Sequence, residues 1–111
     1  MSNDFIILLV HPGKVLKDEI EARNITAGAL ALKLMVHPNK ITEIIRGNRA
    51  ISPETALRLA RYFKTSAQFW MNLQTNYDLA KARILNGEQI NKEISPAHEE
   101  MRSGTINLND I

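Results

Sequence analysis

The sequence of 111 residues contains no cysteine, which excludes disulfide bonds and thiolate-rich metal sites. This absence favours the reducing cytoplasm as the location of the protein. Long hydrophobic runs are also missing. The longest, residues 5–10, has six apolar residues, whereas a helix that spans a bilayer needs roughly 20. Because this run lacks a basic flank and a small-residue cleavage site, we expect neither a signal peptide nor a membrane segment.

Recognisable catalytic and cofactor-binding motifs are absent as well. The three histidines, His11, His37 and His98, are scattered, and none has a cysteine or carboxylate at a metal-ligand spacing. The chain has no glycine-rich phosphate loop and no nucleophile motif. The sequence therefore predicts a protein that is not an enzyme and that binds no metal or other cofactor.

Charge is distributed unevenly along the chain, although the formal net charge is only +2. Residues 1–36 contain four basic and four acidic residues, residues 37–83 contain eight and three, and residues 84–111 contain two and five. The centre is therefore basic and the carboxyl-terminal part acidic. This pattern favours nucleic-acid binding by the centre, with a second surface of opposite charge.

Apolar residues recur at spacings of three and four through most of the chain, and this periodicity predicts an all-α fold. The pattern gives five helices with short connections, namely one from Pro12 to about Asn24, then 27–35, 38–46, one from Pro53 through Phe63, and one that follows Thr65-Ser66. We expect Asn86-Gly87 to break the last of them.

Residues 26–52 contain the most informative pattern, two short helices separated by a tight turn. Thr26 can cap the first helix, and Gly47 ends the second. Two helices of this size across a turn of three or four residues make a helix-turn-helix, which presents its second helix to the major groove of DNA.

The second helix of this motif has two different sides. One side, which can pack against neighbouring helices, holds Ile41, Ile44 and Ile45. The other side holds Asn39, Thr42, Glu43 and Arg46, with Lys40 at its margin. Asparagine can pair with adenine, lysine can donate to guanine and glutamate can accept from cytosine, while Lys40, Arg46 and Arg49 can neutralise phosphates. An ordinary solvated helix face is the alternative interpretation.

The last predicted helix has more apolar surface than a small domain readily covers. Its apolar residues at helical spacing are Phe69, Trp70, Leu73 and Tyr77. Aromatic residues in such a pattern usually belong to a core, and we expect this of at least one of the two neighbouring aromatics. The remaining surface is a candidate two-fold dimer contact, which would let a helix-turn-helix protein read two half-sites.

Weaker patterns flank the helical region. The run 5–10 suits a short strand or a docked arm, Ser95-Pro96 favours a short helix over 97–102, and residues 105–109 alternate like a brief strand. We therefore divide the chain into an apolar arm (1–10), a helix-turn-helix domain (11–83) and an acidic extension (84–111).

With these features the chain resembles the HigA antitoxins, also called VapI-type, a branch of the Xre/Cro/C1 helix-turn-helix proteins with a lambda-repressor-like fold. The resemblance runs from His11 to Arg83. Its landmarks are His11-Pro12-Gly13, residues 39–47, residues 55–60, Phe69-Trp70-Met71-Asn72-Leu73-Gln74, and Tyr77-Asp78-Leu79. The opening tripeptide together with the segment 69–74 makes the resemblance specific.

The resemblance implies a dimeric antitoxin that binds operator DNA, represses its own operon and binds a HigB-type toxin, a ribosome-dependent mRNA endonuclease. By position it implies base contacts from Pro38, Asn39, Lys40 and Glu43. It implies phosphate contacts from Thr42, Arg46, Asn48 and Arg49.

Two positions depart from the wider superfamily. Ala27 stands where a glutamine often contacts a phosphate, and Met35 stands where a glycine commonly closes the preceding helix in a left-handed conformation. Keeping that conformation with methionine costs about 1–2 kcal/mol; otherwise the turn differs. Two alternatives stay open. One is a stand-alone or prophage-type regulator without a toxin, and the other, which these departures favour, is an interaction module that no longer binds DNA.

Overall fold

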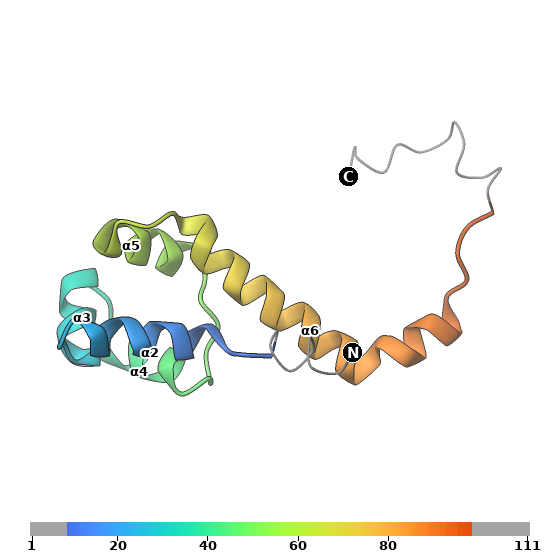
Figure 1. The fold of residues 1–111 in the computed structure, drawn as a ribbon, viewed down its shortest axis with the longest axis horizontal. Coiled ribbons are helices and arrows are strands. Elements are labelled where there is room, and N and C mark those ends of the chain that lie inside the picture. The colour runs from blue at the N-terminus through green and yellow to red at the C-terminus, as the bar shows by residue number, and fades with distance from the viewer. Residues whose placement is uncertain (1–8, 99–111) are drawn as a thin grey trace. The chain divides into compact units, whose positions relative to one another are not determined.

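The structure, a computed structural model, describes residues 9–98 (Figure 1). These residues form five helices and no strand, namely α2 (Pro12–Ala22), α3 (Ala27–Leu34), α4 (Pro38–Ile45), α5 (Pro53–Phe63) and α6 (Ala67–Glu93). The predicted all-α class is confirmed. The elements expected over 5–10, 97–102 and 105–109 lie wholly or mostly outside the described residues. Within residues 9–98, no helix is both long and apolar enough to cross a membrane.

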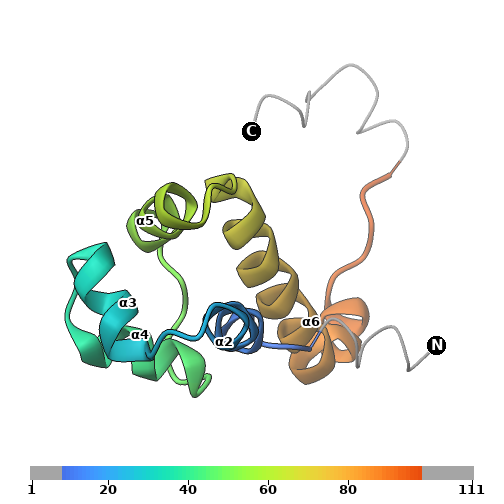
Figure 2. The same ribbon diagram turned by 60° about the vertical axis from the view of Figure 1, so that its left-hand side comes forward.

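The helices that surround the predicted helix-turn-helix share one hydrophobic core. α3 packs against α4 and α5, and α2 packs against α4 (Figure 2). Burying one large aliphatic side chain stabilises a fold by about 1.5–3 kcal/mol, so this core fixes the orientation of α4. Its large buried residues are Leu16, Ile20, Leu30, Leu34, Ile41, Ile44, Ile51, Leu59, Phe63 and Trp70.

Trp70 on α6 belongs to this core. Its side chain has no exposed surface, and its Nε1 donates a hydrogen bond to Thr65 Oγ1 at 2.9 Å. A side chain that is fully buried within one protomer has no surface to offer a second copy. The expectation that at least one of the two neighbouring aromatics belongs to the core is confirmed for Trp70, whereas Phe69 is 43% exposed. A dimer contact through this part of α6 stays a prediction, and Phe69 is better placed for it than Trp70.

α2 and α4 begin in the same way, with a histidine at the N-cap and a proline at the first helical position. Nδ1 of His11 accepts a hydrogen bond from the amide of Gly13 at 2.9 Å. Nδ1 of His37 accepts one from the amide of Asn39 at 3.1 Å. Each histidine thus satisfies an amide that the first helical turn leaves without a partner. This role is not predictable from the sequence, because histidine is not among the usual capping residues.

The helices α2, α3, α4 and α5 all end in the same turn. One residue adopts a left-handed conformation, and the next amide donates to the carbonyl five positions back. The left-handed residues are Asn24, Met35, Gly47 and Lys64. The closing hydrogen bonds run from Ile25 to Ile20, Val36 to Ala31, Asn48 to Glu43 and Thr65 to Ala60, with N···O distances of 2.9–3.1 Å.

Met35 keeps the turn that glycine would make at lower cost. Its φ and ψ angles are 60° and 45°, and its side chain is 82% exposed. Of the two outcomes that the sequence allowed, the structure has the strained one. The connection between α3 and α4 therefore retains its left-handed geometry with a methionine in place of glycine.

Gly13 allows α2 to touch the backbone of α4. A β-carbon at this position would lie 1.9 Å from the carbonyl oxygen of Ile44, far inside any van der Waals contact. Any other residue would push the two helices apart. The glycine of the His-Pro-Gly opening is thus required by this approach.

α6 continues to Glu93, so the predicted break at Asn86-Gly87 is wrong. Glycine within a helix costs about 1 kcal/mol relative to alanine, which does not end a helix where the flanking residues favour it. The last turn is supported by a hydrogen bond from Gln89 Nε2 to Glu93 Oε2 at 2.7 Å. Described residues up to Lys81 belong to one compact unit and those from Ala82 to a second.

Replacing Met35 with glycine should raise the free energy of unfolding by about 1 kcal/mol, because it relieves the left-handed conformation. Urea denaturation followed by circular dichroism measures the change. Lys33→Gly, two residues earlier in the right-handed part of α3, is the matched control and should lower stability by about 1 kcal/mol. Equal effects of both substitutions would contradict strain at Met35.

Gly13→Ala should destabilise the protein by about 3 kcal/mol, since its β-carbon overlaps the Ile44 carbonyl and the close contact cannot relax without moving α4. Gly28→Ala is the control, because a β-carbon at Gly28 would meet no atom within 4 Å. The control should stabilise α3 by about 0.5–1 kcal/mol. A neutral Gly13→Ala would show that the two helix backbones are not in contact.

Candidate nucleic-acid interface

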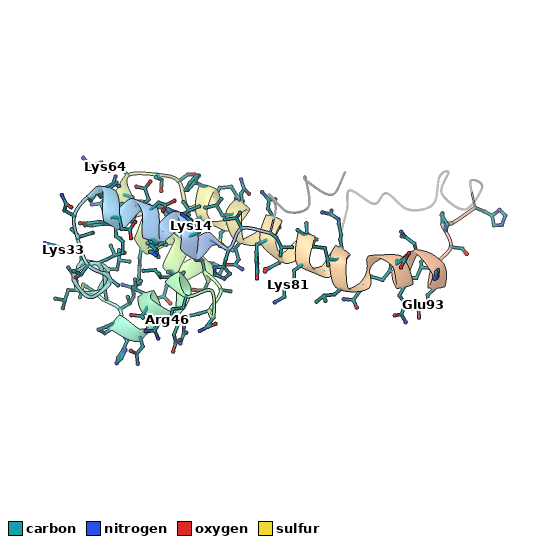
Figure 3. The ribbon with its side chains drawn as sticks, turned by 60° about the horizontal axis from the view of Figure 1, so that its bottom comes forward. Lys14, Lys33, Arg46, Lys64, Lys81 and Glu93 are labelled. Atoms are coloured by element: carbon teal, nitrogen blue, oxygen red, sulfur yellow. The ribbon has the colours of Figure 1, made fainter. Side chains whose placement is uncertain are left out.

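α4 has one buried side and one open side, as the sequence predicted. Ile41 and Ile44 are fully buried against the core. Arg46 lies at the carboxyl end of α4, among side chains that extend away from the helices (Figure 3). The eight predicted DNA-contact residues are all at least partly exposed, namely Pro38, Asn39, Lys40, Thr42, Glu43, Arg46, Asn48 and Arg49. Three of them are basic and one is acidic, so the open side is net positive.

The loop after α4 holds two of these residues, Asn48 and Arg49, and is fixed at both ends. At its start the left-handed Gly47 turns the chain. At its end Ile51 is buried, and its amide donates a hydrogen bond to Gln74 Oε1 at 2.8 Å. The turn at Gly47 and the side chain of Gln74 on α6 thus fix the two ends of this loop.

Gln74 is a residue whose role the sequence analysis missed. It is only 5% exposed, and its Nε2 also donates to Asp78 Oδ1 at 3.0 Å. Both ends of its amide are therefore satisfied, as a buried polar group requires. The one sign in the sequence was a polar residue four positions after Trp70, on the side of the helix that faces the core.

Glu43 and Arg49 were predicted to make separate contacts, and the structure brings them together. Glu43 Oε1 lies 2.7 Å from Arg49 Nε and 2.6 Å from Arg49 Nη2. Neither distance follows from helical periodicity, because Arg49 lies beyond the end of α4.

Thr42 uses its hydroxyl proton within α4. The Oγ1 atom donates to the carbonyl oxygen of Pro38 at 3.0 Å, as threonines within helices often do. A phosphate oxygen can only accept hydrogen bonds. In this rotamer Thr42 therefore has no hydroxyl proton left for the predicted contact with a phosphate.

His11 lies beside the end of α4 as well as at the start of α2. Its ring meets the ring of Tyr77 edge to face, with centroids 4.8 Å apart, and a β-carbon at Gly47 would lie 3.9 Å from its Cγ. Desolvation lowers the pKa of His11 from its usual value; the charge of Asp78 opposes this shift, and that of Lys81 adds to it.

Comparison with known proteins assigns this arrangement to a family. Residues 16–70 match the family described as helix-turn-helix. The chain is 49% identical over 74 residues to virulence-associated protein I of Dichelobacter nodosus, an alignment that covers 66% of this chain and 68% of that protein. Its fold matches the antitoxin HigA of Pseudomonas aeruginosa, solved with the higBA promoter, with a TM-score of 0.79 and 48% identity. The chain belongs to the HigA branch of the Xre/Cro/C1 helix-turn-helix family.

The likeness to HigA proteins extends over most of each chain. The alignment with the Pseudomonas HigA structure covers 81% of this chain and 99% of that one. An addiction module antidote protein of the HigA family from Coxiella burnetii has a TM-score of 0.78 and 40% identity, with 80% and 98% of the two chains covered. The resemblance noted from the sequence is therefore confirmed at the level of the family.

Stability should fall as the pH drops from about 7.5 to 5.5, partly because of His11. Its folded-state pKa is lowered, so the unfolded chain binds a proton more readily below about pH 6.5. The contribution is fully present above that pH and is lost as the pH falls. His11→Asn keeps a capping acceptor but cannot titrate. Urea midpoints of this variant should depend less steeply on pH than those of the wild type, whatever its absolute stability. Parallel slopes would exclude His11 as the group responsible.

Proposed function

We propose that this protein is an operator-binding repressor and antitoxin of the HigA kind, which binds the DNA upstream of its own operon through α4. The observation that carries this proposal is the two-sided character of α4. On its apolar side Ile41 and Ile44 are fully buried and Ile45 is partly buried, whereas its polar, net positive side is open. The Pseudomonas HigA structure, which has 48% identity and the same fold, was solved with its promoter DNA, and this supports the same use of α4 here.

The residues on the open side of α4 suit both base contacts and phosphate contacts. Asn39 and Lys40 lie in the first turn of α4, where side chains of a recognition helix reach base edges. An asparagine amide can pair with adenine, and a lysine can donate to guanine. Arg46 and Asn48 lie at the other end, where contacts with phosphates set the register of the helix without reading the sequence.

The geometry of the turn favours this proposal over an interaction module that no longer binds DNA. Met35 retains the left-handed conformation, so this departure from the superfamily leaves the approach of α3 to α4 unaltered. Ala27 stands in place of the glutamine that often contacts a phosphate in the superfamily, and this is a single contact among several. Neither position alters the open side of α4.

We further propose that the protein acts as a dimer and binds a HigB-type toxin. Phe69 on α6 is exposed, Leu73 is partly buried against the core and Tyr77 is partly buried against His11; these residues form the candidate dimer surface. Two copies of α4 would then meet two half-sites of an operator. A neighbouring reading frame that encodes a small basic protein, inactivated when both are produced together, would support the toxin role. Its absence would favour a regulator without a toxin.

Fluorescence anisotropy with a labelled duplex from upstream of the operon tests DNA binding directly. Operator recognition predicts nanomolar affinity and a preference of about a thousandfold over scrambled DNA, with affinity that falls steeply as salt rises. The titration should saturate at two protomers per operator. Weak and equal binding to both duplexes would contradict the proposal.

Asn39→Ala and Arg46→Ala separate base reading from phosphate contact. Asn39→Ala should weaken operator binding by about 1–3 kcal/mol and relax the preference at one base pair of each half-site. Arg46→Ala should weaken binding to all sequences alike and reduce the salt dependence by about one counterion. The same profile for both variants across a set of base-substituted operators would show that the two roles are wrongly assigned.

A further inference from the structure

The ion pair between Glu43 and Arg49 uses one edge of the guanidinium group. Nε and Nη2 of Arg49 both approach the same carboxylate oxygen, Oε1 of Glu43, at 2.7 and 2.6 Å. A guanidinium group carries five N–H donors in a rigid fork. The donors of Nη1 and the second donor of Nη2 lie on the edge away from the carboxylate. This free edge has the geometry that binds a phosphate through two parallel hydrogen bonds.

Stability alone gives little reason for this pair. The side chains of Arg49 and Glu43 are 44% and 41% exposed. Ion pairs at such exposure contribute about 0–1 kcal/mol, because solvent screens the charges and two long side chains lose rotamer freedom. A carboxylate on the side of α4 that faces DNA would also repel phosphates unless a cation neutralises it.

The backbone on both sides of Arg49 is already fixed. The turn at Gly47 closes with a hydrogen bond from the amide of Asn48 to the carbonyl of Glu43 at 2.9 Å. On the other side the amide of Ile51 is held by Gln74 at 2.8 Å. Glu43 then restrains the side chain, so that Arg49 is ordered from its Cα to its guanidinium group before any DNA is bound.

We propose that Glu43 is a positioning residue, which orients Arg49 toward the DNA backbone and does not itself read a base. This inference rests on the proposed operator binding and revises the base contact that the family resemblance implied for Glu43. A preordered arginine loses less rotamer entropy when it binds a phosphate. Glu43 and Arg49 therefore make a single phosphate contact together, in which Arg49 binds the phosphate and Glu43 holds Arg49 in place.

A double-mutant cycle tests this role. Operator affinity is measured for the wild type, Glu43→Ala, Arg49→Ala and the double variant, each on the operator and on single-base-pair substitutions of it. Glu43→Ala should weaken binding by about threefold to fivefold on every duplex, in line with the strength of an exposed ion pair, and should cause no further loss once Arg49 is alanine. Arg49→Lys, which keeps the charge but lacks the fork, should respond little to the loss of Glu43.

Asp18→Ala is the matched control, since Asp18 forms an exposed ion pair with Lys14 at 3.0 Å on α2. It removes an exposed acid of the same kind and should leave the operator affinity within about twofold, as expected for an exposed pair away from α4. Urea denaturation of each variant confirms that the fold is retained. In the free protein, the Arg49 Nε–H signal in NMR spectra should be protected from exchange and lose that protection in Glu43→Gln.

The outcomes separate this inference from the proposed function. If Glu43→Ala weakens binding at one base pair only, and its effect adds to that of Arg49→Ala, Glu43 reads a base and the inference is overturned while operator binding stands. If the wild type shows no preference for its operator, both fail together. An unprotected Arg49 Nε–H signal in the wild type would overturn the pairing itself.

Discussion

The contact between Gly13 and the carbonyl of Ile44 is the constraint on which the rest of the structure depends. Two backbones meet there without a side chain between them, and α2 lies so close to α4 that a β-carbon at Gly13 would overlap the carbonyl oxygen of Ile44. His11, two residues earlier, caps α2 and lies next to Gly47 at the end of α4. One tripeptide thus sets the position of α4, the proposed recognition helix, and supports the turn that follows it.

A second group of contacts fixes the position of the loop that follows α4. Ile51 enters the core, and its amide is held by the buried amide of Gln74 on α6. The left-handed Gly47 and this hydrogen bond leave little freedom to Asn48 and Arg49. The candidate interface therefore depends on a buried polar residue that binds a backbone amide as well as on the side chains that face the solvent.

Much of this arrangement was predictable from the sequence, because periodicity determines which side of a helix is buried. The isoleucines of α4, the capping role of Thr26 and the end of α2 near Asn24 follow from local rules. Pairs of residues joined only by the fold do not. Nothing local predicts that Gln74 meets Ile51, that a loop arginine meets Glu43, or that Trp70 is fully buried while Phe69 is not. The continuation of α6 through Gly87 was missed because a weak helix former was taken as a helix end.

The backbone contact of α2 with α4 has a consequence for how binding specificity can change. Since the docking of α4 depends on backbone atoms and on its buried isoleucines, the exposed side chains of the same helix are free to vary without altering the scaffold. New operator sequences are then accessible through exchange of a few outward residues, and transplanting that set between related repressors should transplant their preference. Glu43 and Arg49 are the exception, since either one changed alone leaves a charge without its counterpart; they must evolve together.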